Sequence, residues 1–331
     1  MDFSALPKVE LHLHLDCSLS FDVVQQLNSK ISREEYRSRF VAPDKCRDLA
    51  DYIRRSENAV SLMQDEESLR LVVGDLFNQL EADNIIYVEI RFAPLLHIQE
   101  DLTAEQVVNT VNEAVEEQVE TTGIEGGIIL CTLRHYSEEQ SMRTVQLVEE
   151  FADSSRVVGF DIAADEAGFP IDEHVSAFEY ANAKGLNCTA HAGEACGAES
   201  VWETLEQFKP SRIGHGVRSV EDPELMEYLN EHDIHLEVCP TSNVQTNVFE
   251  TIEDHSINTL SNNGISLSVN TDTRTISDVT LDSEYQLLEQ VFDWDKERFL
   301  DANLEAIDHA FTNEPTKEKL RRTICEAYLN N

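Results

Sequence analysis

Apolar, β-branched runs of strand length recur along the chain, and most of them are followed by a stretch with apolar residues at helical spacing. Gly, Pro, Asn or Asp bounds each run, which is typical of buried strands that end in turns. Strands that alternate with helices and are apolar on both faces pair in parallel. We therefore predict eight parallel strands, over residues 9–14, 85–92, 127–133, 157–163, 186–192, 212–216, 235–239 and 266–272.

The intervening segments have apolar residues three and four positions apart, the pattern of helices that cover a sheet with one face. Eight strand–helix units in about 270 residues fit a closed barrel better than an open sheet. We predict an α/β fold of the (β/α)8 TIM type, in a single domain over residues 1–331. The helices are predicted over residues 104–121, 138–151, 171–184, 199–208, 223–231, 252–262, 281–291, 296–311 and 315–329.

The connection between the first two strands is exceptional, because the roughly 70 residues from Asp16 to Asn84 are too many for one crossover helix. It contains amphipathic stretches at residues 48–63 and 66–81. This segment leaves the C-terminal end of the first strand, so we expect a helical insertion near the mouth of the barrel.

Acidic residues greatly outnumber basic ones: 64 Asp and Glu against 25 Lys and Arg give a formal net charge of -39. Such a field repels phosphate backbones and anionic lipid head groups, so nucleic acid and membranes are poor partners. A small neutral substrate in a shielded cleft is compatible with it, because local groups decide affinity there. The acidic excess fits either adaptation to high salt or an ordinary, heavily charged enzyme.

The seven cysteines are scattered and form no Cys-x-x-Cys pair. This pattern argues against a disulfide framework and a structural zinc knuckle, and we expect most of them to be reduced core thiols. Residues 1–10 carry an acid at position 2 and no apolar run, and no segment approaches 18 uninterrupted apolar residues. We expect a cytoplasmic protein, and make no prediction about its oligomeric state.

The first strand carries two histidines at alternate positions. Successive side chains of a strand point to opposite faces, so His12 and His14 project together while the leucines between them take the other face. In a barrel the leucines would contact the helices, and the histidines would lie inside near the C-terminal rim, where active sites of this architecture occur. Taken alone, such a pair is better explained as two hydrogen-bonded core histidines, and it is the other polar residues of the chain that favour a metal site.

Three further polar residues end predicted strands. His191 ends the fifth strand, His215 the sixth and Asp272 the eighth. Each alone is compatible with a turn or a cap, because polar residues cluster at strand ends. The C-terminal ends of all strands meet at one barrel mouth, so we expect these residues to converge there with the two histidines of the first strand.

Three imidazoles and one carboxylate, with a position left for water, are a ligand set that suits zinc, and we predict one Zn²⁺ per chain. A zinc ion brings the pKa of bound water from about 15.7 to roughly 7, so hydroxide becomes available at neutral pH. Glu194 follows His191 by three residues. A carboxyl group in that place suits an acid and proton shuttle beside the substrate.

Seven segments of the chain resemble the adenosine deaminase family in their order and spacing, and the resemblance covers nearly the whole sequence. It implies zinc-dependent hydrolytic deamination of adenosine and 2′-deoxyadenosine to inosine and 2′-deoxyinosine with release of ammonia, an activity of purine salvage. The segments are residues 7–16, 87–94, 161–166, 189–194, 211–216, 236–243 and 268–272.

The resemblance also implies roles for the residues at the barrel mouth. Glu194 matches the residue that protonates the purine N1, which makes C6 a better acceptor for hydroxide. His215 matches the histidine that orients and helps to deprotonate the water and stabilises the developing oxyanion. The positions that match the zinc ligands are His12, His14, His191 and Asp272.

Four positions match substrate contacts of the family. Asp16 matches the ribose contact, with His14 beside it in the same pocket, and the backbone N–H of Ala164 matches a donor to purine N3. Many members have a glycine in place of Ala164, and a second aspartate in place of Thr273 that binds N7. A threonine hydroxyl can still bind N7, but more weakly, so the departure affects affinity and base selectivity rather than catalysis.

Three other functions remain open. A related deaminase could act on adenine, on a 6-substituted nucleoside or on a nucleoside monophosphate, although a phosphate would need a cationic clamp that this acidic chain hardly offers. A binuclear amidohydrolase on the same barrel would use a carboxylated lysine of the fourth strand, and residues 157–166 contain no lysine. A non-catalytic barrel is the third, and the presence of every expected ligand and acid disfavours it.

Several other polar residues have plainer interpretations. Glu89 and Arg91 share one face of the second strand, and we expect a structural ion pair inside the barrel rather than chemistry. Cys17 lies next to the proposed ribose contact and is interpreted as a small packing residue. His235 and His255 have no neighbours expected to converge with them, and are interpreted as ordinary histidines.

Overall fold

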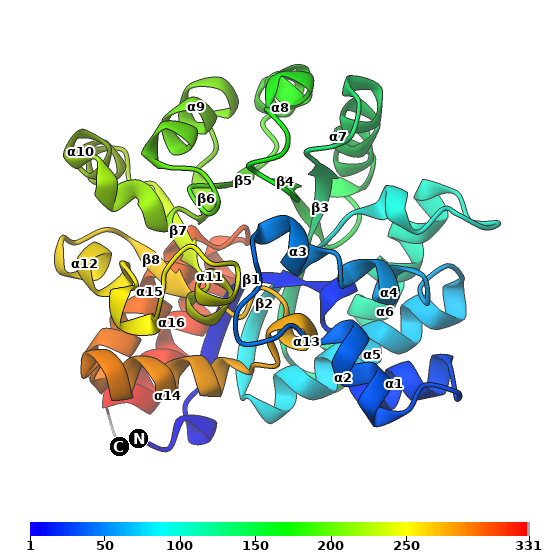
Figure 1. Ribbon diagram of the computed structural model, residues 1–331, viewed down its shortest axis with the longest axis horizontal. Helices are drawn as coiled ribbons and strands as arrows, with labels where there is room; N and C mark the ends of the chain where they lie inside the picture. Colours follow the sequence, from blue (N-terminus) through cyan, green and yellow to red (C-terminus); the bar gives the residue numbers. More distant parts are fainter. Residues whose placement is uncertain (330–331) are drawn as a thin grey trace.

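Eight parallel strands form the centre of the computed structural model, which describes residues 1–329 (Figure 1). They alternate with helices along the chain, as the hydrophobic pattern predicts. The strands are β1 (Lys8–His14), β2 (Ile85–Phe92), β3 (Glu125–Leu133), β4 (Val157–Ala163), β5 (Thr189–Ala192), β6 (Arg212–His215), β7 (His235–Val238) and β8 (Leu267–Val269).

The strands close into a barrel. Two four-stranded parallel sheets run β1 to β4 and β5 to β8 in sequence order. A parallel bridge between Phe160 and Cys188 joins β4 to β5, and one between Leu13 and Asp272 joins the end of β8 to β1. At the second seam the His14 N–H donates to the Asp272 carbonyl at 2.8 Å. The predicted (β/α)8 barrel is confirmed.

The last strand is shorter than predicted, because polar side chains replace its regular pairing. Residues 266–272 were expected to be extended, but β8 ends at Val269. The side-chain oxygen of Asn270 accepts hydrogen bonds from the backbone N–H groups of Leu11 and His12, at 2.8 and 3.1 Å. The backbone then turns through a positive φ of 62° at Asp272, which points this side chain into the barrel mouth.

Helices surround the barrel in an outer ring, with α7 to α10 side by side along one half of it (Figure 1). Polar residues start several of them: Thr103 and Gln106 form a capping box at the start of α6, which ends at Gly123 with a φ of 76°. The ring contains α6 (Ala104–Thr122), α7 (Glu138–Ala152), α8 (Val175–Lys184), α9 (Ala198–Phe208), α10 (Pro223–Glu231), α12 (Ile257–Asn262), α14 (Leu281–Phe292), α15 (Lys296–His309) and α16 (Glu314–Leu329).

Helices between β1 and β2 form the predicted insertion, and α3 lies across the barrel opening in Figure 1. The amphipathic stretch at residues 48–63 is two short helices rather than one, since the chain turns at Arg54 and Arg55. Tyr52 and Ile53 of this segment line the cavity at the mouth. The insertion consists of α1 (Phe21–Leu27), α2 (Arg33–Phe40), α3 (Leu49–Ile53), α4 (Ser56–Val60) and α5 (Glu66–Ala82).

The main apolar core lies between the barrel and its helices. Leu11 and Leu13 of β1 are fully buried in it, whereas His12 between them points inside the barrel. All seven cysteines are free, and five of them are buried. Within residues 1–329, no helix combines the length and the apolar character needed to cross a bilayer. Two short helices complete the mouth: α11 (Pro240–Gln245) after β7 and α13 (Arg274–Ser277) after β8.

Candidate active site

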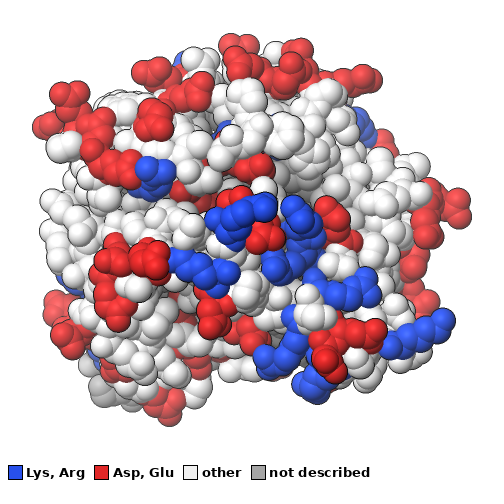
Figure 2. All heavy atoms as spheres, viewed as in Figure 1, with Lys and Arg blue, Asp and Glu red and all other residues white. Residues whose placement is uncertain are grey.

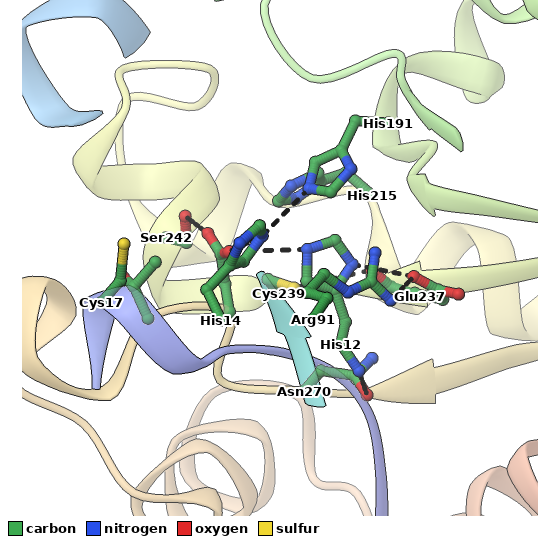
Figure 3. A network of polar contacts seen from close by, with 12 residues as sticks. His12, His14, Cys17, Arg91, His191, His215, Glu237, Cys239, Ser242 and Asn270 are labelled. Carbon is green, nitrogen blue, oxygen red and sulfur yellow. Dashed lines mark hydrogen bonds and ion pairs between the residues drawn. The ribbon is translucent and has the colours of Figure 1, made fainter. Parts of the chain in front are cut away.

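Four residues from three parts of the chain, His12, His14, His191 and Asp272, place their donor atoms around one point at the barrel mouth. Figure 3 labels the three histidines of this group. The His14 Nε2 atom lies 3.3 Å from the His191 Nε2 atom. The Asp272 Oδ1 atom lies 3.5 Å from the Nε2 atoms of both His12 and His14. Ligands at the corners of a tetrahedron with metal bonds of about 2.0–2.2 Å stand about 3.3–3.6 Å apart. The predicted ligands are thus brought together at the spacing of a metal site.

Hydrogen bonds behind two of the histidines direct their lone pairs to this point. His12 Nδ1 lies 2.9 Å from a carboxylate oxygen of Glu237, and His191 Nδ1 lies 3.1 Å from one of Asp161. A proton on each Nδ1 atom leaves the Nε2 atom as a donor for a metal. The His12 Nε2 atom is buried and has no hydrogen-bond partner among the described residues, as expected for an atom that faces a cation.

The protonation states of the cluster suit metal binding. Burial lowers the pKa of His14 to about 3, so its imidazole is neutral at physiological pH. Burial opposes ionisation of Asp272, but the neighbouring His12 outweighs it and holds the pKa of Asp272 well below its usual range. Ser242 donates a hydrogen bond to Asp272 Oδ2 at 2.7 Å, which leaves Oδ1 directed at the histidines. At His12, burial and the nearby Arg91 are outweighed by the contacts with Asp272 and Glu237, which raise its pKa. Imidazoles with one carboxylate are borderline ligands, which fit Zn²⁺ once the rings have released their protons.

A buried network of charges lies below the cluster. Arg91 of β2 contacts Asp161 at 2.9 Å and Glu237 at 2.6 Å, the two carboxylates that orient the histidines. Glu89 instead contacts Arg212, at 2.5 Å. The predicted pairing of Glu89 with Arg91 is therefore wrong, although both are structural charges inside the barrel. Side chains two residues apart on one strand point to the same side of the sheet. Here Glu89 pairs with Arg212 of β6, whereas Arg91 pairs with Asp161 of β4 and Glu237 of β7.

Glu194 lies in the loop after β5 and is 4% exposed. Burial and the nearby Asp272 raise the pKa of Glu194 well above the usual range of a glutamate, so the group is a neutral acid at physiological pH. The carboxylate of Glu166 holds this loop by accepting from the backbone N–H groups of Gly193 and Glu194, at 2.8 and 3.0 Å. The Glu194 Oε2 atom lies 3.6 Å from His215 Nε2. This places an acid and an imidazole side by side at the cavity.

Three predicted site residues have a left-handed backbone. The φ angles of Ala164, His215 and Asp272 are 83°, 63° and 62°. A residue with a Cβ atom adopts this region only at a cost, and such strain gathers at functional sites, where it sets the direction of a side chain. At Ala164 the side chain is only a methyl group, so the strained φ serves to direct the backbone N–H and C=O groups rather than a functional side chain.

We expect the substitution Ala164→Gly to increase the free energy of unfolding by about 0.5–1 kcal/mol, because glycine adopts a φ of 83° without steric strain. Urea unfolding of the two proteins measures the difference. The neighbouring Ala163→Gly is the matched control, since Ala163 lies within β4, where φ is negative. Ala163→Gly should lower the free energy of unfolding by about the amount that Ala164→Gly raises it. If both substitutions lowered the free energy of unfolding equally, the backbone at Ala164 would not be strained.

A cavity of about 550 Å³ opens above the cluster and is lined by all the predicted site residues except His12, together with α3 and α4 of the insertion. Asp16 lines it and is 5% exposed. Burial opposes ionisation of Asp16, but the nearby His97 and His14 outweigh it and lower its pKa, so the carboxylate is charged. His97 Nε2 lies 3.8 Å from Asp16 Oδ2 and was not recognised from the sequence.

Thr273 follows Asp272, and its hydroxyl is one of three hydroxyl groups in contact, the others being those of Tyr52 and Ser277. The Tyr52 hydroxyl contacts both Thr273 Oγ1 and Ser277 Oγ. Thr273 is the N-cap of α13, yet its side chain caps no backbone N–H. Tyr52 thus holds the hydroxyl that stands where many family members have a second aspartate.

Basic side chains gather near the centre of the face that contains the mouth, whereas acidic ones are spread around its rim (Figure 2). Nearby acids pair with several of the basic groups: Lys45 with Glu250 at 3.3 Å and Arg47 with Asp48 at 2.8 Å. Among the described residues, the acidic side chains that line the cavity are those of Asp16, Glu57, Asp165, Glu194 and Asp272, and the one arginine is Arg54. The charge of the lining therefore favours a neutral ligand over an anionic one.

A second buried acid lies outside the cavity, on α14. Glu284 is 1% exposed and accepts a hydrogen bond from the Thr241 N–H at 3.3 Å. Burial raises the pKa of Glu284 to about 8. In the unfolded chain the pKa is about 4.3, so the folded protein retains a proton that the unfolded chain has released. The contribution of this group to stability is therefore full at acid pH and is lost as pH rises to about 8.

We expect Glu284→Gln to remove this dependence, because the amide keeps an acceptor oxygen and does not ionise. Relative to the variant, the wild type should lose about 3–4 kcal/mol of unfolding free energy between pH 5 and pH 8. Denaturant unfolding at several pH values measures the difference. Parallel pH profiles of the two proteins would show that Glu284 titrates normally.

Sequence reasoning did not assign several residues that position the site. Asp161 is the one charged residue of the otherwise apolar strand β4, and Glu237 lies between a leucine and a valine in β7; a charge between apolar strand residues is the signal that could have identified them. Glu166 lies in a recognised segment without an assigned role. Tyr52 belongs to an amphipathic stretch, where an aromatic residue is typical of a helix that packs, so no sequence signal distinguished it.

Comparisons with known proteins agree with this geometry. The family model described as adenosine deaminase matches residues 7–327. A curated adenosine deaminase from Clostridium acetobutylicum is 33% identical over 326 residues, covering 96% of this chain and 97% of the relative.

Two solved structures have the same fold. An adenine deaminase from Arthrobacter aurescens superposes with a TM-score of 0.90 at 23% identity, covering 98% of this chain and 100% of the other. An amidohydrolase from Burkholderia ambifaria with bound zinc superposes with a TM-score of 0.91 at 22% identity, covering 99% and 92% of the two chains.

Proposed function

Because the chain belongs to the adenosine deaminase family, we propose that it is a zinc-dependent enzyme that hydrolyses adenosine and 2′-deoxyadenosine to inosine, 2′-deoxyinosine and ammonia. The observation that carries this proposal is the convergence of His12, His14, His191 and Asp272 on one point beside Glu194. This activity would serve purine salvage.

One Zn²⁺ would be held by three imidazoles and one carboxylate. When bound, it would lower the pKa of a water molecule so that hydroxide is available at neutral pH. The carboxylates of Glu237 and Asp161 keep the imidazoles of His12 and His191 in the tautomer that this binding requires. The zinc-bound structural neighbour supports the choice of metal.

Glu194 is the proton donor to the purine ring in this proposal. Its raised pKa keeps it protonated at neutral pH, and it lines the cavity beside the metal ligands. A proton transferred from its carboxyl group to ring atom N1 withdraws electrons from C6, which then accepts a water-derived oxygen more readily. The amino group on C6 leaves as ammonia, and C6 becomes a carbonyl carbon.

The ribose end of the cavity favours a free nucleoside. The charged carboxylate of Asp16 can accept hydrogen bonds from ribose hydroxyls. The same charge would repel the phosphate of a nucleoside monophosphate, and Arg54 is the only arginine or lysine that lines the cavity within the described residues. Adenine is the second candidate substrate, because the adenine deaminase of Arthrobacter aurescens has the same fold.

A substrate panel on protein of known metal content tests the proposal. Removal of metal with a chelator should abolish deamination of adenosine, and about one equivalent of Zn²⁺ per chain should restore it. Adenosine and 2′-deoxyadenosine should be turned over far better than AMP or adenine. No activity on adenosine with good activity on adenine or AMP would overturn the choice of substrate, and two tightly bound metals per chain would overturn the mononuclear site.

A further inference from the structure

Two buried side chains, those of His255 and Asn243, connect the backbone of α12 to the imidazole of His215. The Ile257 N–H donates to His255 Nδ1 at 3.0 Å. His255 Nε2 lies 3.2 Å from the side-chain oxygen of Asn243, and the Asn243 amide nitrogen lies 3.1 Å from His215 Nδ1. His255 and Asn243 are 3% and 0% exposed, so water does not compete for these contacts.

The Ile257 N–H determines the position of the proton in each of these three hydrogen bonds. A backbone N–H can only donate, so His255 Nδ1 must be an acceptor, and the ring carries its proton on Nε2. That proton must point to an acceptor, which makes the facing atom of Asn243 its oxygen. The amide NH₂ of Asn243 therefore faces His215 Nδ1, which must accept. Only one pattern of protons satisfies all three contacts.

The consequence for His215 is a single tautomer. With Nδ1 as an acceptor the ring is neutral, because an imidazolium would set two donors against each other at the 3.1 Å contact with Asn243. The remaining proton lies on Nε2, the atom that is 3.6 Å from Glu194 Oε2 beside the cavity. A ring in this state offers the cavity an N–H and no lone pair.

We propose that His255 and Asn243 are positioning residues that hold His215 as a hydrogen-bond donor toward the oxygen that adds to the substrate, and not as a base. This inference rests on the proposed function for the identity of that oxygen. The two roles implied by the family resemblance, deprotonation of water and stabilisation of a developing oxyanion, need opposite tautomers. The Ile257 N–H selects the second, since a donor aimed at growing negative charge stabilises it.

Nitrogen NMR of protein labelled with ¹⁵N-histidine tests the tautomer directly. The ring signals of His215, assigned by their loss in His215→Gln, should show a protonated Nε2 and an unprotonated Nδ1. Asn243→Asp should reverse the two, because a carboxylate accepts from Nδ1 and thus leaves the lone pair on Nε2. A protonated Nδ1 in the wild-type protein would overturn the proposal. This readout does not depend on turnover, so it stands apart from a failure of the adenosine assay.

Kinetics of the same variants test the role. Asn243→Asp should lower kcat for adenosine about a hundredfold or more with little change in KM, which is the size of effect seen when an oxyanion donor is lost. It would also create an Asp–His pair, an arrangement that favours a base. Retained or increased kcat in this variant would therefore overturn the donor role.

Two further variants separate positioning from folding. His255→Phe keeps a ring in place but frees the Asn243 amide to rotate, so it should give a mixture of His215 tautomers and a kcat lowered about tenfold. His235→Gln is the matched control, since His235 is also buried but contacts the hydroxyls of Ser266 and Ser268. It should leave the His215 signals unchanged, and equal loss of the tautomer in both variants would overturn the specific role of His255.

Discussion

Replacing Glu194 with glutamine is expected to lower kcat for adenosine about a thousandfold while metal content and fold stay unchanged. The amide has the shape of the protonated carboxyl group but cannot give a proton to the purine ring. The raised pKa of Glu194 means that the wild-type group is already neutral, so the substitution removes no charge from the folded protein at neutral pH. Steady-state kinetics with metal analysis measures both effects.

The control for this substitution is a glutamate at the other end of the barrel. Glu305 lies on α15 and accepts a hydrogen bond from the Ser266 hydroxyl at 2.7 Å, next to the start of β8. Glu305→Gln should leave kcat within about twofold, because a lost surface interaction far from the cavity does not affect the transition state. Full activity in Glu194→Gln would contradict its role as the acid, whereas loss of metal would show that the residue supports the ligands instead.

The fold could be predicted because its information is local. The apolar runs of β2 and β4 are bounded by turn residues at both ends, and the structure has those strands at the predicted residues. Alternation along β1 placed two histidines on one face for the same reason. The local pattern does not predict a strand end at which a side chain takes the place of backbone pairing. The side chain of Asn270 accepts hydrogen bonds from backbone N–H groups of β1, and β8 therefore ends at Val269, three residues before Asp272.

The site could be predicted only as far as strand ends and the family resemblance define it. The partners of the site residues depend on contacts across the barrel, which no local pattern contains. Tyr52 and Thr273 are 221 residues apart in sequence and share a hydrogen bond. Glu89 and Arg91 are neighbours on one strand but contact charges from other strands. A residue type and its position indicate that a charge is buried, while the closed barrel decides which opposite charge it meets.

Replacing Arg91 with methionine is expected to lower the free energy of unfolding by about 3–5 kcal/mol. The guanidinium joins Asp161 and Glu237, and all three side chains are 0% exposed. Methionine fills similar space but removes the cation that the two buried carboxylates share. Glu237 keeps Arg212 at 2.8 Å, so the cost comes mainly from Asp161, whose remaining basic partner among the described residues is the His191 imidazole. Urea unfolding of the metal-free proteins measures the loss.

The same substitution should weaken metal binding about tenfold to a hundredfold, because the two carboxylates also orient the imidazoles of His12 and His191. Arg218→Met provides the comparison: Arg218 pairs with Glu221 at 2.7 Å on the surface, where such a pair contributes less than about 1 kcal/mol. Similar small losses in both variants would show that the buried charges relax or become protonated on folding. A large loss of stability with unchanged zinc affinity would instead show that the network supports the barrel without orienting the ligands.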